Sequence, residues 1–419
     1  MKILIALALI AAPATAQTLD QRADKIIIDA NLAENAMQRV MAETKRLKAD
    51  IAAGELIAAP LPVDGAPVVT TPPTGEFASP SLAGLDAIPS NFNRSTQLLS
   101  SPIPSSAAPD VMGAFRFLCQ PSHLNYDDPI VYPGVIGGSP HMHQWFGNTL
   151  GNGKSTFDTL RTSGDSTCMG PLNRSAYWVP AMIDQNEKVV QPDFLSVYYK
   201  RRPKSDPQCQ IQGAACLGVP RGLRFIFGYD MTKMMTKPDQ PENTKHFYYT
   251  CVTPQYGHRG GTQTVLKGLP CLPGDYLTAI MSAPDCWDGK NLDSPDHRSH
   301  MAYAGYGNNG VYKCPSTHPY IVPTFTLSVN YKVQEGDVID RWYETSSRMP
   351  GMDPMEPGKT FHSDFFMAWD DETKLTWEAN CIDKMLNCSD GTLGNGQIMK
   401  RPPSYDGKTR PRVAIPPRP

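Results

Sequence analysis

The chain has no strong excess of charge of either sign. Its 39 Lys and Arg residues nearly balance 41 Asp and Glu residues, and the formal net charge at pH 7 is -2. Because proteins that bind nucleic acids usually carry a basic face, we expect no nucleic-acid partner. The sequence also lacks the glycine-rich loops that bind dinucleotides or phosphates and the G-x-S-x-G turn of α/β-hydrolases. Neither nucleotide-dependent chemistry nor that type of serine hydrolase is indicated.

Long apolar runs are missing after the first residues. Lys2 gives a positive start, residues 3–12 form a short apolar core, and Ala14-Thr15-Ala16 is a small-residue cleavage site. This pattern predicts a secretory signal peptide over residues 1–16. The apolar run is too short for an ordinary membrane span, although a short uncleaved anchor is the alternative. We therefore expect a mature chain without a transmembrane segment, either secreted or periplasmic.

The ten cysteines are absent from the N-terminal quarter, and no two of them have C-x-x-C spacing. The missing spacing argues against a cysteine–zinc site. An even number of cysteines after a secretory signal predicts up to five disulfides in an oxidising compartment. Cys209–Cys216 and Cys381–Cys388 are close enough in sequence to form local bridges.

A long helical pattern precedes the cysteine-rich region, in residues 17–57. Small and apolar residues alternate there in steps of four and three, as in a coiled-coil seam. These positions are Leu19, Ala23, Ile26, Ala30, Ala33, Met37, Val40, Thr44, Leu47 and Ile51. One interpretation is a homo-oligomerisation stalk over residues 19–57. The alternative is an amphipathic helix that docks on the domain or forms only in part.

Residues 58–110 are rich in Pro, Ser, Thr, Ala and Gly, which predicts a linker. A proline-rich tail covers residues 401–419, so the folded domain is expected over residues 111–400. Short strand-like runs separated by turn residues recur in it: 114–118, 176–182, 195–199, 223–227, 247–252, 276–281, 320–333 and 365–369. They predict a mainly β fold, an antiparallel sandwich or jelly roll with long disulfide-linked loops. An irregular α+β domain is the alternative.

Six of the nine histidines lie in four short polar motifs of this domain: HMH at 141–143, DHRSH at 296–300, CPSTHP at 314–319 and HSD at 362–364. In an extended strand, residues two apart project from one face, which would pair His141 with His143 and His362 with Asp364. His297 and His300 would share a face in a helical turn. Histidine serves both as a metal ligand and as an acid or base near neutral pH. We predict a site that contains His141, His143, His297, His300 and His362.

Two interpretations of this histidine site stay open. The first is a divalent metal ion bound by His141, His143, His300 and His362. The second is acid–base catalysis without a metal, with Asp288, Asp364 and Tyr303 as partners of the histidines. Met142 would point to the opposite side of the strand from its neighbours and is interpreted as a core residue.

Aromatic and cationic residues inside the polar motifs suggest where a substrate could bind. Trp145 and Trp287 are candidates for sugar stacking, although most tryptophans of a domain this size lie in the core. Arg298 and Lys290 could bind the carboxylate or sulfate of an acidic sugar. Surface solvation is the alternative for both cations.

The ordered motifs resemble a secreted domain family known as domain of unknown function nineteen-ninety-six. They read DPIVYPG (128–134), HMHQWFG (141–147), SAYWVP (175–180), CWDGKNLD (286–293), DHRSHMAY (296–303), CPSTHP (314–319) and HSDF (362–365). The resemblance covers about residues 113–390. Its fungal members can carry a carbohydrate-binding WSC module, which this chain lacks. The resemblance implies secretion, disulfides and a link to cell-wall or polysaccharide material, but no catalytic residues.

These observations lead to three functional hypotheses. The first is an exported hydrolase or lyase that acts on a polysaccharide through the histidine site. In a lyase, a histidine or Tyr303 would abstract a proton, and Arg298 or a metal would neutralise the sugar carboxylate. The second is a non-catalytic protein that binds glycan or another envelope component. The third is a copper or other transition-metal redox protein on the same histidines.

Overall fold

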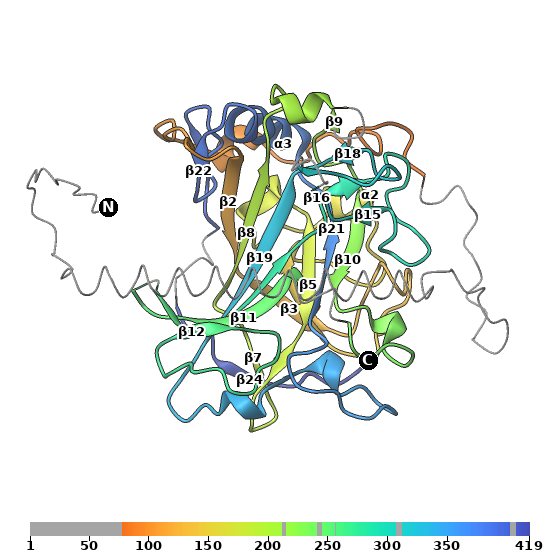
Figure 1. Cartoon of the computed structure of the whole chain (residues 1–419), viewed down its shortest axis with the longest axis vertical. Helices are drawn as coiled ribbons and strands as arrows, with labels where there is room; N and C mark the ends of the chain where they lie inside the picture. Colours follow the sequence, from red (N-terminus) through yellow and green to blue (C-terminus); the bar gives the residue numbers. More distant parts are fainter. Residues whose placement is uncertain (1–77, 212–214, 241–244, 256, 307–311, 403–407) are drawn as a thin grey trace, which may run out of the picture. The chain divides into compact units, whose positions relative to one another are not determined.

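The computed structural model describes residues 78–211, 215–240, 245–255, 257–306, 312–402 and 408–419 (Figure 1). The predicted signal peptide, the predicted helix of residues 17–57 and the first part of the predicted linker lie outside these residues. No helix in the described ranges is long and apolar enough to cross a membrane.

Two large sheets pack face to face in the described part of the chain. The first has five antiparallel strands in the order β10 (Arg224–Gly228), β21 (His362–Phe366), β5 (Ala176–Pro180), β4 (His143–Gly147) and β3 (Pro121–Asn125). The second has the order β12 (His258–Gln263), β11 (Phe247–Val252), β13 (Tyr276–Ser282), β19 (Thr324–Lys332), β8 (Phe194–Arg201), β2 (Gly113–Cys119) and β22 (Asn387–Cys388). Its pairs are antiparallel except for β2 with β22. Figure 1 shows β8 and β19 beside β5 and β21.

Aromatic side chains fill the space between the two sheets. Phe325 of β19 lies 4.7 Å from Phe365 of β21 and 6.0 Å from Phe225 of β10, between ring centroids. The hydroxyls of Tyr177 on β5 and Tyr199 on β8 are 2.9 Å apart, so these buried polar tips bond each other. Burying one such ring stabilises a fold by about 1.5–3 kcal/mol. This aromatic layer therefore holds the sandwich together.

Side-chain alternation distinguishes the two sheets. Along β8 buried and half-buried residues alternate, whereas β4, β5 and β21 are buried throughout. Phe365 points to the other sheet, so His362 and Asp364 point to the opposite, outer face. The outer face of the five-stranded sheet is therefore also buried and carries polar residues.

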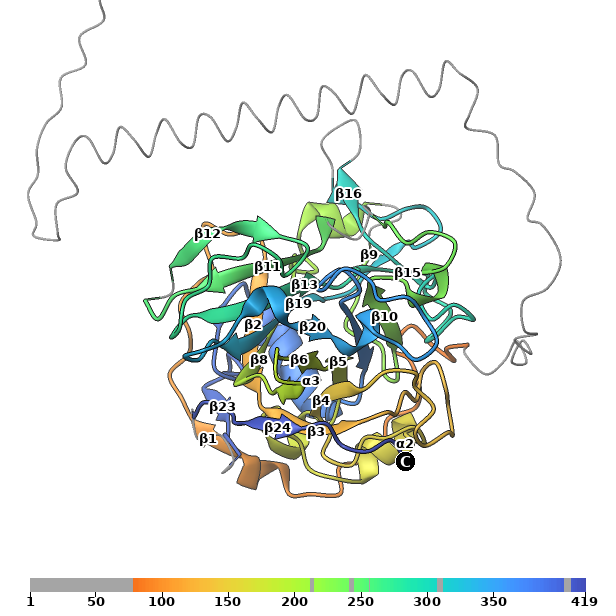
Figure 2. The ribbon, with the colours of Figure 1, turned by 90° about the horizontal axis from the view of Figure 1, so that it is seen from below.

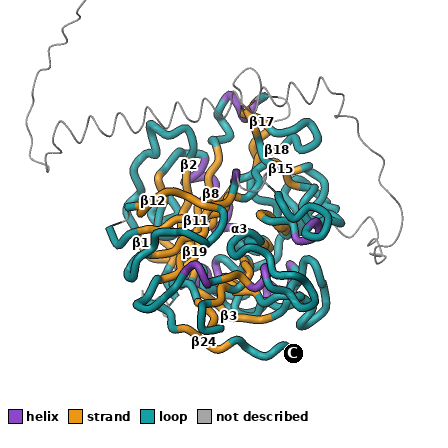
Figure 3. Tube along the Cα trace, turned by 60° about the horizontal axis from the view of Figure 1, so that its bottom comes forward, coloured by secondary structure: helices purple, strands orange, loops and turns teal. Residues whose placement is uncertain are grey.

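The remaining elements are short and lie around the sandwich. Two smaller sheets have four strands each. One has the order β20 (Tyr343–Glu344), β6 (Met182–Ile183), β7 (Lys188–Val190) and β24 (Arg412–Ala414), and the other has the order β15 (Met301–Ala302), β14 (Cys286–Trp287), β18 (Tyr320–Ile321) and β9 (Ala215–Cys216). Two further sheets are strand pairs: β1 (Leu98–Ser100) with β23 (Gln397–Met399), and β16 (Gly305–Tyr306) with β17 (Tyr312–Lys313). The α-helices of the described residues are α2 (Phe157–Thr162) and α3 (Asp371–Trp377). In Figure 3, strands and loops make up most of the described trace.

The prediction of a mainly β sandwich is confirmed. The strand-like run 247–252 matches β11, and 276–281 lies within β13. The run 320–333 divides into β18 and β19 because Val322-Pro323 interrupts the pairing. The run 365–369 is displaced, since β21 begins earlier, at His362. The α+β alternative does not hold for the described residues, in which α-helix is limited to two short segments.

All ten cysteines form disulfides. The two predicted local bridges, Cys209–Cys216 and Cys381–Cys388, are both present. The other three, which sequence spacing did not predict, are Cys119–Cys168, Cys251–Cys271 and Cys286–Cys314. Five disulfides are consistent with an extracellular protein.

Segments outside the sandwich strands also pack against the domain. Within the predicted linker, β1 pairs with β23, and Arg94 forms a 2.7 Å ion pair with Glu372. In the C-terminal tail, β24 pairs with β7; both strands are labelled in the lower part of Figure 1, and β24 is labelled again in the view from below in Figure 2. The guanidinium of Arg418 lies 5.3 Å from the ring centre of Tyr126.

Candidate metal centre

Three buried histidines converge on the outer face of the five-stranded sheet. His143 begins β4 and His362 begins β21, and both strands pair antiparallel with β5 between them. His141 precedes β4 by two residues. Its Nε2 atom lies 2.9 Å from Nε2 of His143 and 3.2 Å from Nε2 of His362. One ligand atom from each ring lies within 4.8 Å of the other two.

The local backbone explains why His141 and His143 meet. Ala181 donates its N–H to the carbonyl of Met142 at 2.9 Å, which continues the pairing of β4 in an extended conformation. The side chain of Met142 is fully buried in an apolar cluster, as predicted. The two flanking imidazoles therefore project together on the other side.

Backbone carbonyls orient two of the three rings. Nδ1 of His143 lies 3.0 Å from the carbonyl oxygen of Asp127, and Nδ1 of His362 lies 2.9 Å from that of Thr360. A carbonyl can only accept, so the hydrogen-bond network assigns the proton of each ring to Nδ1. Nε2 of each ring then carries a lone pair that faces the centre. Metal-ligating histidines usually have this arrangement.

His141 completes the group and shows that the donor set fits a cation. Its Nε2 faces the Nε2 lone pairs of His143 and His362. It must therefore either donate a proton to one of these two atoms or bind, together with both, the same positive ion. Nδ1 of His141 is buried and has no hydrogen-bond partner among the described residues. Three convergent imidazole nitrogens provide the ligand type that zinc, copper, iron and nickel accept.

Burial keeps the three imidazoles neutral. It lowers the pKa of His141 well below its ordinary value, and the neighbouring His143 and His362 lower it further. Burial also lowers the pKa of His143, against the opposing effect of Asp128, and it lowers that of His362 to about 3. Because the neutral ring is the ligating form, these residues need lose no proton to bind a metal at neutral pH.

The same shifts predict that the metal-free protein is sensitive to acid. The unfolded chain takes up protons on these rings as the pH falls below about 6.5, whereas folded His362 resists until about pH 3. The free energy of unfolding is therefore not reduced by His362 above pH 6.5, and it decreases as the pH falls because only the unfolded chain takes up the proton. In urea unfolding with a chelator, wild type should lose about 4 kcal/mol more than His362→Gln between pH 7 and pH 3. If the stability of wild type and of His362→Gln fell in parallel with pH, the assignment of His362 as a neutral buried ring would be wrong.

A buried carboxyl group lies beside the three histidines. Asp364 follows His362 by two residues on the same face of β21, and its Oδ2 is buried without a hydrogen-bond partner among the described residues. Burial raises the pKa of Asp364 well above its ordinary value, the nearby Asp128 raises it further, and Arg298 partly opposes both. Asp364 therefore favours the protonated form and can donate a hydrogen bond or a proton.

Glu344 at the end of β20 supports the segment that orients His362. Its carboxylate accepts from the N–H of Thr360 at 2.9 Å, from the hydroxyl of the same residue at 2.7 Å, and from the N–H of Gly358 at 2.6 Å. The Thr360 carbonyl in turn accepts the proton of His362 Nδ1. Glu344 thus acts on the centre through this carbonyl.

Replacing Glu344 with alanine should weaken metal binding about 10- to 100-fold, the usual effect of losing an outer support of a metal ligand. Metal affinity measured by chelator competition checks this. Glu344→Gln, which keeps a carbonyl acceptor, should lose less, and the exposed Glu356→Ala should match wild type. Equal affinities for Glu344→Ala and wild type would show that Thr360 is held by other contacts.

Comparison with known proteins decides the family. The family model described as Domain of unknown function (DUF1996) matches residues 128–369, more than half of the chain. The chain belongs to the DUF1996 family. No curated protein and no solved structure matches the chain significantly. The three histidines and Asp364 all lie inside the matched DUF1996 region.

Two predicted histidines of the DUF1996 domain do not join the centre. Both ring nitrogens of His300 are occupied, Nδ1 by the Ser294 hydroxyl at 2.8 Å and Nε2 by the Arg224 carbonyl at 2.9 Å. The structure therefore does not support His300 as a metal ligand. His297 bonds Asp293 through Nδ1 at 2.9 Å and adopts a left-handed backbone with φ of 56°. Both residues stabilise the loop that covers β10.

The predicted acid–base partners are also dispersed. Asp288 accepts the N–H groups of Lys290 and Asn291 at 2.8 and 2.9 Å, so it caps a turn. Tyr303 donates its hydroxyl to the carbonyl of Ser282 at 2.9 Å and lines a different pocket. Among the predicted catalytic carboxylates, Asp364 alone lies beside the histidines.

The predicted substrate-binding residues of the DUF1996 domain have mostly structural contacts. Trp145 and Trp287 are fully buried, so neither ring offers an open face to a sugar, and the stacking prediction does not hold for them. Lys290 is exposed. Arg298 donates to the carbonyls of Gly228 at 3.1 Å and Tyr229 at 2.8 Å. Each of these bonds uses one N–H of a different terminal nitrogen of Arg298.

Sequence reasoning missed several residues that shape the centre. Asp127 and Thr360 act through their backbone carbonyls, for which side-chain identity gives no signal. Glu344 lies well before Thr360 and His362 in the sequence, so no local spacing links it to the centre. The adjacent acids Asp127 and Asp128 were the sequence signal that could have indicated this part of the centre.

Proposed function

We propose that this DUF1996 protein is an exported, metal-dependent hydrolase of polysaccharides. One transition-metal ion would be held by Nε2 of His141, His143 and His362. The observation that carries the proposal is the convergence of three buried Nε2 atoms, two of them on rings whose Nδ1 protons are bound by backbone carbonyls. Three histidine ligands with one further position left for water are characteristic of catalytic zinc sites.

The chemistry follows from the charge of the ligands. His141, His143 and His362, as three neutral imidazoles, would leave a bound ion its full positive charge, and such an ion would supply a nucleophile near neutral pH by lowering the pKa of water. Asp364, which burial favours in the protonated form, is the candidate to give a proton to the departing sugar oxygen. Hydrolysis of a glycosidic bond needs both of these functions.

We propose hydrolysis ahead of β-elimination because Tyr303 and Arg298, the two residues that an elimination would add to the histidines and the metal, already have partners. The Tyr303 hydroxyl donates to the Ser282 carbonyl, and each terminal nitrogen of Arg298 donates one N–H to a backbone carbonyl. Elimination through a histidine base and the metal would give an unsaturated product, which distinguishes the two reactions. The polysaccharide itself is proposed from the suspected link of the DUF1996 family to cell-wall or polysaccharide material. Export is supported by the five disulfides.

A copper redox centre on the same histidines is the second candidate. A donor set of imidazoles without a thiolate suits copper as well as zinc. Elemental analysis of protein purified from an oxidising compartment, without chelator or histidine tag, separates the two. About one zinc per chain, together with new reducing ends from a polysaccharide, is the expected result. Absence of any metal even after reconstitution would contradict both candidates, and saturable glycan binding without cleavage would favour a binding protein.

We further propose that residues 19–57 form a homo-oligomerising coiled coil that precedes the domain of residues 111–400. The support is the seam of small and apolar residues in the sequence. Light scattering on the mature chain should give a dimer or trimer, and deletion of residues 17–57 should give a monomer. A monomeric mature chain would contradict this part of the proposal.

A further inference from the structure

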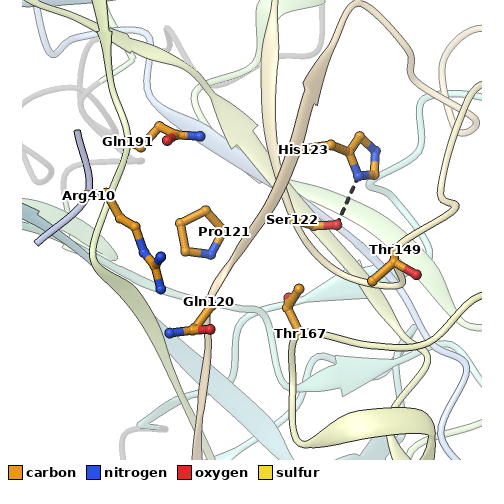
Figure 4. Close-up of a pocket in the computed structure, with 8 residues that line it drawn as sticks. All are labelled: Gln120, Pro121, Ser122, His123, Thr149, Thr167, Gln191 and Arg410. Carbon is orange, nitrogen blue, oxygen red and sulfur yellow. Dashed lines mark hydrogen bonds between the residues drawn. The ribbon is translucent and has the colours of Figure 1, made fainter. Parts of the chain in front are cut away.

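A polar pocket lies beside β3, the edge strand of the five-stranded sheet. The register of β3 against β4 shifts by one residue between Pro121 and Leu124, which is a β-bulge at Ser122 and His123. Bulges re-aim side chains and are common next to functional sites. Here the bulge directs Ser122 and His123 to a pocket of about 450 Å³ (Figure 4). That volume lies in the ~300–1,000 Å³ range of small-molecule sites.

The pocket is connected to the metal centre by stacked rings. His123 stacks on Trp145 with 5.4 Å between ring centroids, and Trp145 stacks on Trp178 at 4.4 Å. Trp178 is the register partner of Asp364. Two rings thus separate His123 from the carboxyl group beside the three histidines, on one face of one sheet.

The lining of the pocket is polar and almost entirely uncharged. It includes the carboxamides of Gln120 and Gln191 and the hydroxyls of Ser122, Thr149 and Thr167. Arg410, whose backbone N–H bonds Asp193 at 2.7 Å, provides the one formally charged side chain of this lining, and no carboxylate contributes. Figure 4 shows Gln120, Gln191 and Arg410 around the ring of Pro121. A metal cation or an amine would find no counter-charge in such a pocket.

Gln120 independently indicates a ligand. Its side chain is 3% exposed, and its Oε1 atom has no hydrogen-bond partner among the described residues. A buried acceptor without a partner costs about 1–3 kcal/mol, and rotation of the carboxamide into the pocket, where a ligand hydroxyl can donate to it, would remove this cost. Sugar hydroxyls both donate and accept, which matches the mixture of amide and hydroxyl groups in the lining.

We infer that this pocket binds a neutral sugar unit of the polysaccharide as a subsite separate from the metal centre. The inference rests on the proposed function for its substrate class, but not for its geometry. His123 of the pocket stacks on Trp145, which lies on the sheet face that carries the three histidines, so the subsite lies at the edge of the same sheet as the centre.

Calorimetric titration of the full mature protein with cellohexaose, xylohexaose and chitohexaose tests the inference. At least one oligosaccharide should bind, and the double variant Gln120→Met/Gln191→Met should bind it about tenfold more weakly, because two neutral hydrogen bonds are lost. The metal content of the double variant should stay unchanged. Gln255→Met, an exposed glutamine outside the pocket, is the matched control.

Binding of none of the three oligosaccharides, or equal affinity of the double variant and wild type, would overturn the inference. If the double variant does not fold, the single variant Gln191→Met at a half-buried position gives the same test with a smaller effect. Wild-type protein that binds an oligosaccharide but holds no metal, even after reconstitution, would retain the subsite and reject the hydrolase. Wild-type protein that holds the metal and releases reducing ends, but binds no oligosaccharide more tightly than the double variant, would retain the hydrolase and reject the subsite.

Discussion

Replacing His143 with alanine is expected to abolish turnover and to remove the bound metal ion. The substitution deletes one of three ligands and leaves the Nε2 lone pairs of His141 and His362 without their third partner. Loss of an outer support alone weakens such sites about 10- to 100-fold, so loss of a ligand should weaken metal binding by more than about 100-fold. Metal content after dialysis and release of reducing ends from polysaccharide measure the two effects.

The folded state should survive this substitution. The ring is neutral and fully buried, donates to the carbonyl of Asp127 and contacts Nε2 of His141, so its loss in metal-free protein leaves a cavity and an unpaired carbonyl and costs about 2–4 kcal/mol. Thermal unfolding should therefore be compared with a chelator present in both samples, because a bound ion itself raises the unfolding temperature. His318→Ala, outside the centre, is the control and should retain metal and turnover. If His143→Ala lost folding and turnover together, the ring would be structural.

Removing the Cys119–Cys168 disulfide should destabilise the protein more than removing Cys381–Cys388. All four cysteines are fully buried, so the double alanine variants leave similar cavities. The bridges differ in the separation of the joined residues, 49 against 7. Loop-closure entropy then predicts that the free energy of unfolding falls by about 4 kcal/mol without Cys119–Cys168 and by about 2 kcal/mol without Cys381–Cys388. Urea unfolding of the two double alanine variants measures the difference.

The larger effect has a structural reason as well. Cys119 ends β2 of the seven-stranded sheet, whereas Cys168 lies in the loop between β4 and β5 of the other sheet. The bridge therefore ties the two layers of the sandwich, and the unfolded chain without it gains much more freedom. Equal losses in the two variants would show that native contacts, and not the entropy of the unfolded chain, decide the stability.

Much of the fold was predictable from local pattern. Alternation of apolar residues placed β11 and β13 well, because a strand with one buried face repeats every two residues. The run at 365–369 was displaced because β21 is buried on both faces and its first residues, His362 and Ser363, are polar. Polar residues buried behind loops do not show in a hydropathy pattern.

The candidate centre was predictable in part for the same reason. The two-residue spacings predicted shared faces for His141 with His143 and for His362 with Asp364, and the Nε2 atoms of the first pair lie 2.9 Å apart. Which pairs meet depends on the strand order β21, β5 and β4, and nothing local in the sequence specifies it. His300 stands in an equally polar motif, yet its ring serves the loop over β10.

The separation of the ligands along the chain has a consequence for the time at which metal can be acquired. His141 and His362 are 221 residues apart, and they meet only when β21 has paired with β5. Zinc fingers, whose ligands are near neighbours, use the ion to drive folding. Here capture must wait until synthesis has passed residue 362 and the sheet is assembled. The ion found in the isolated protein would therefore report the metal supply of the compartment in which folding is completed.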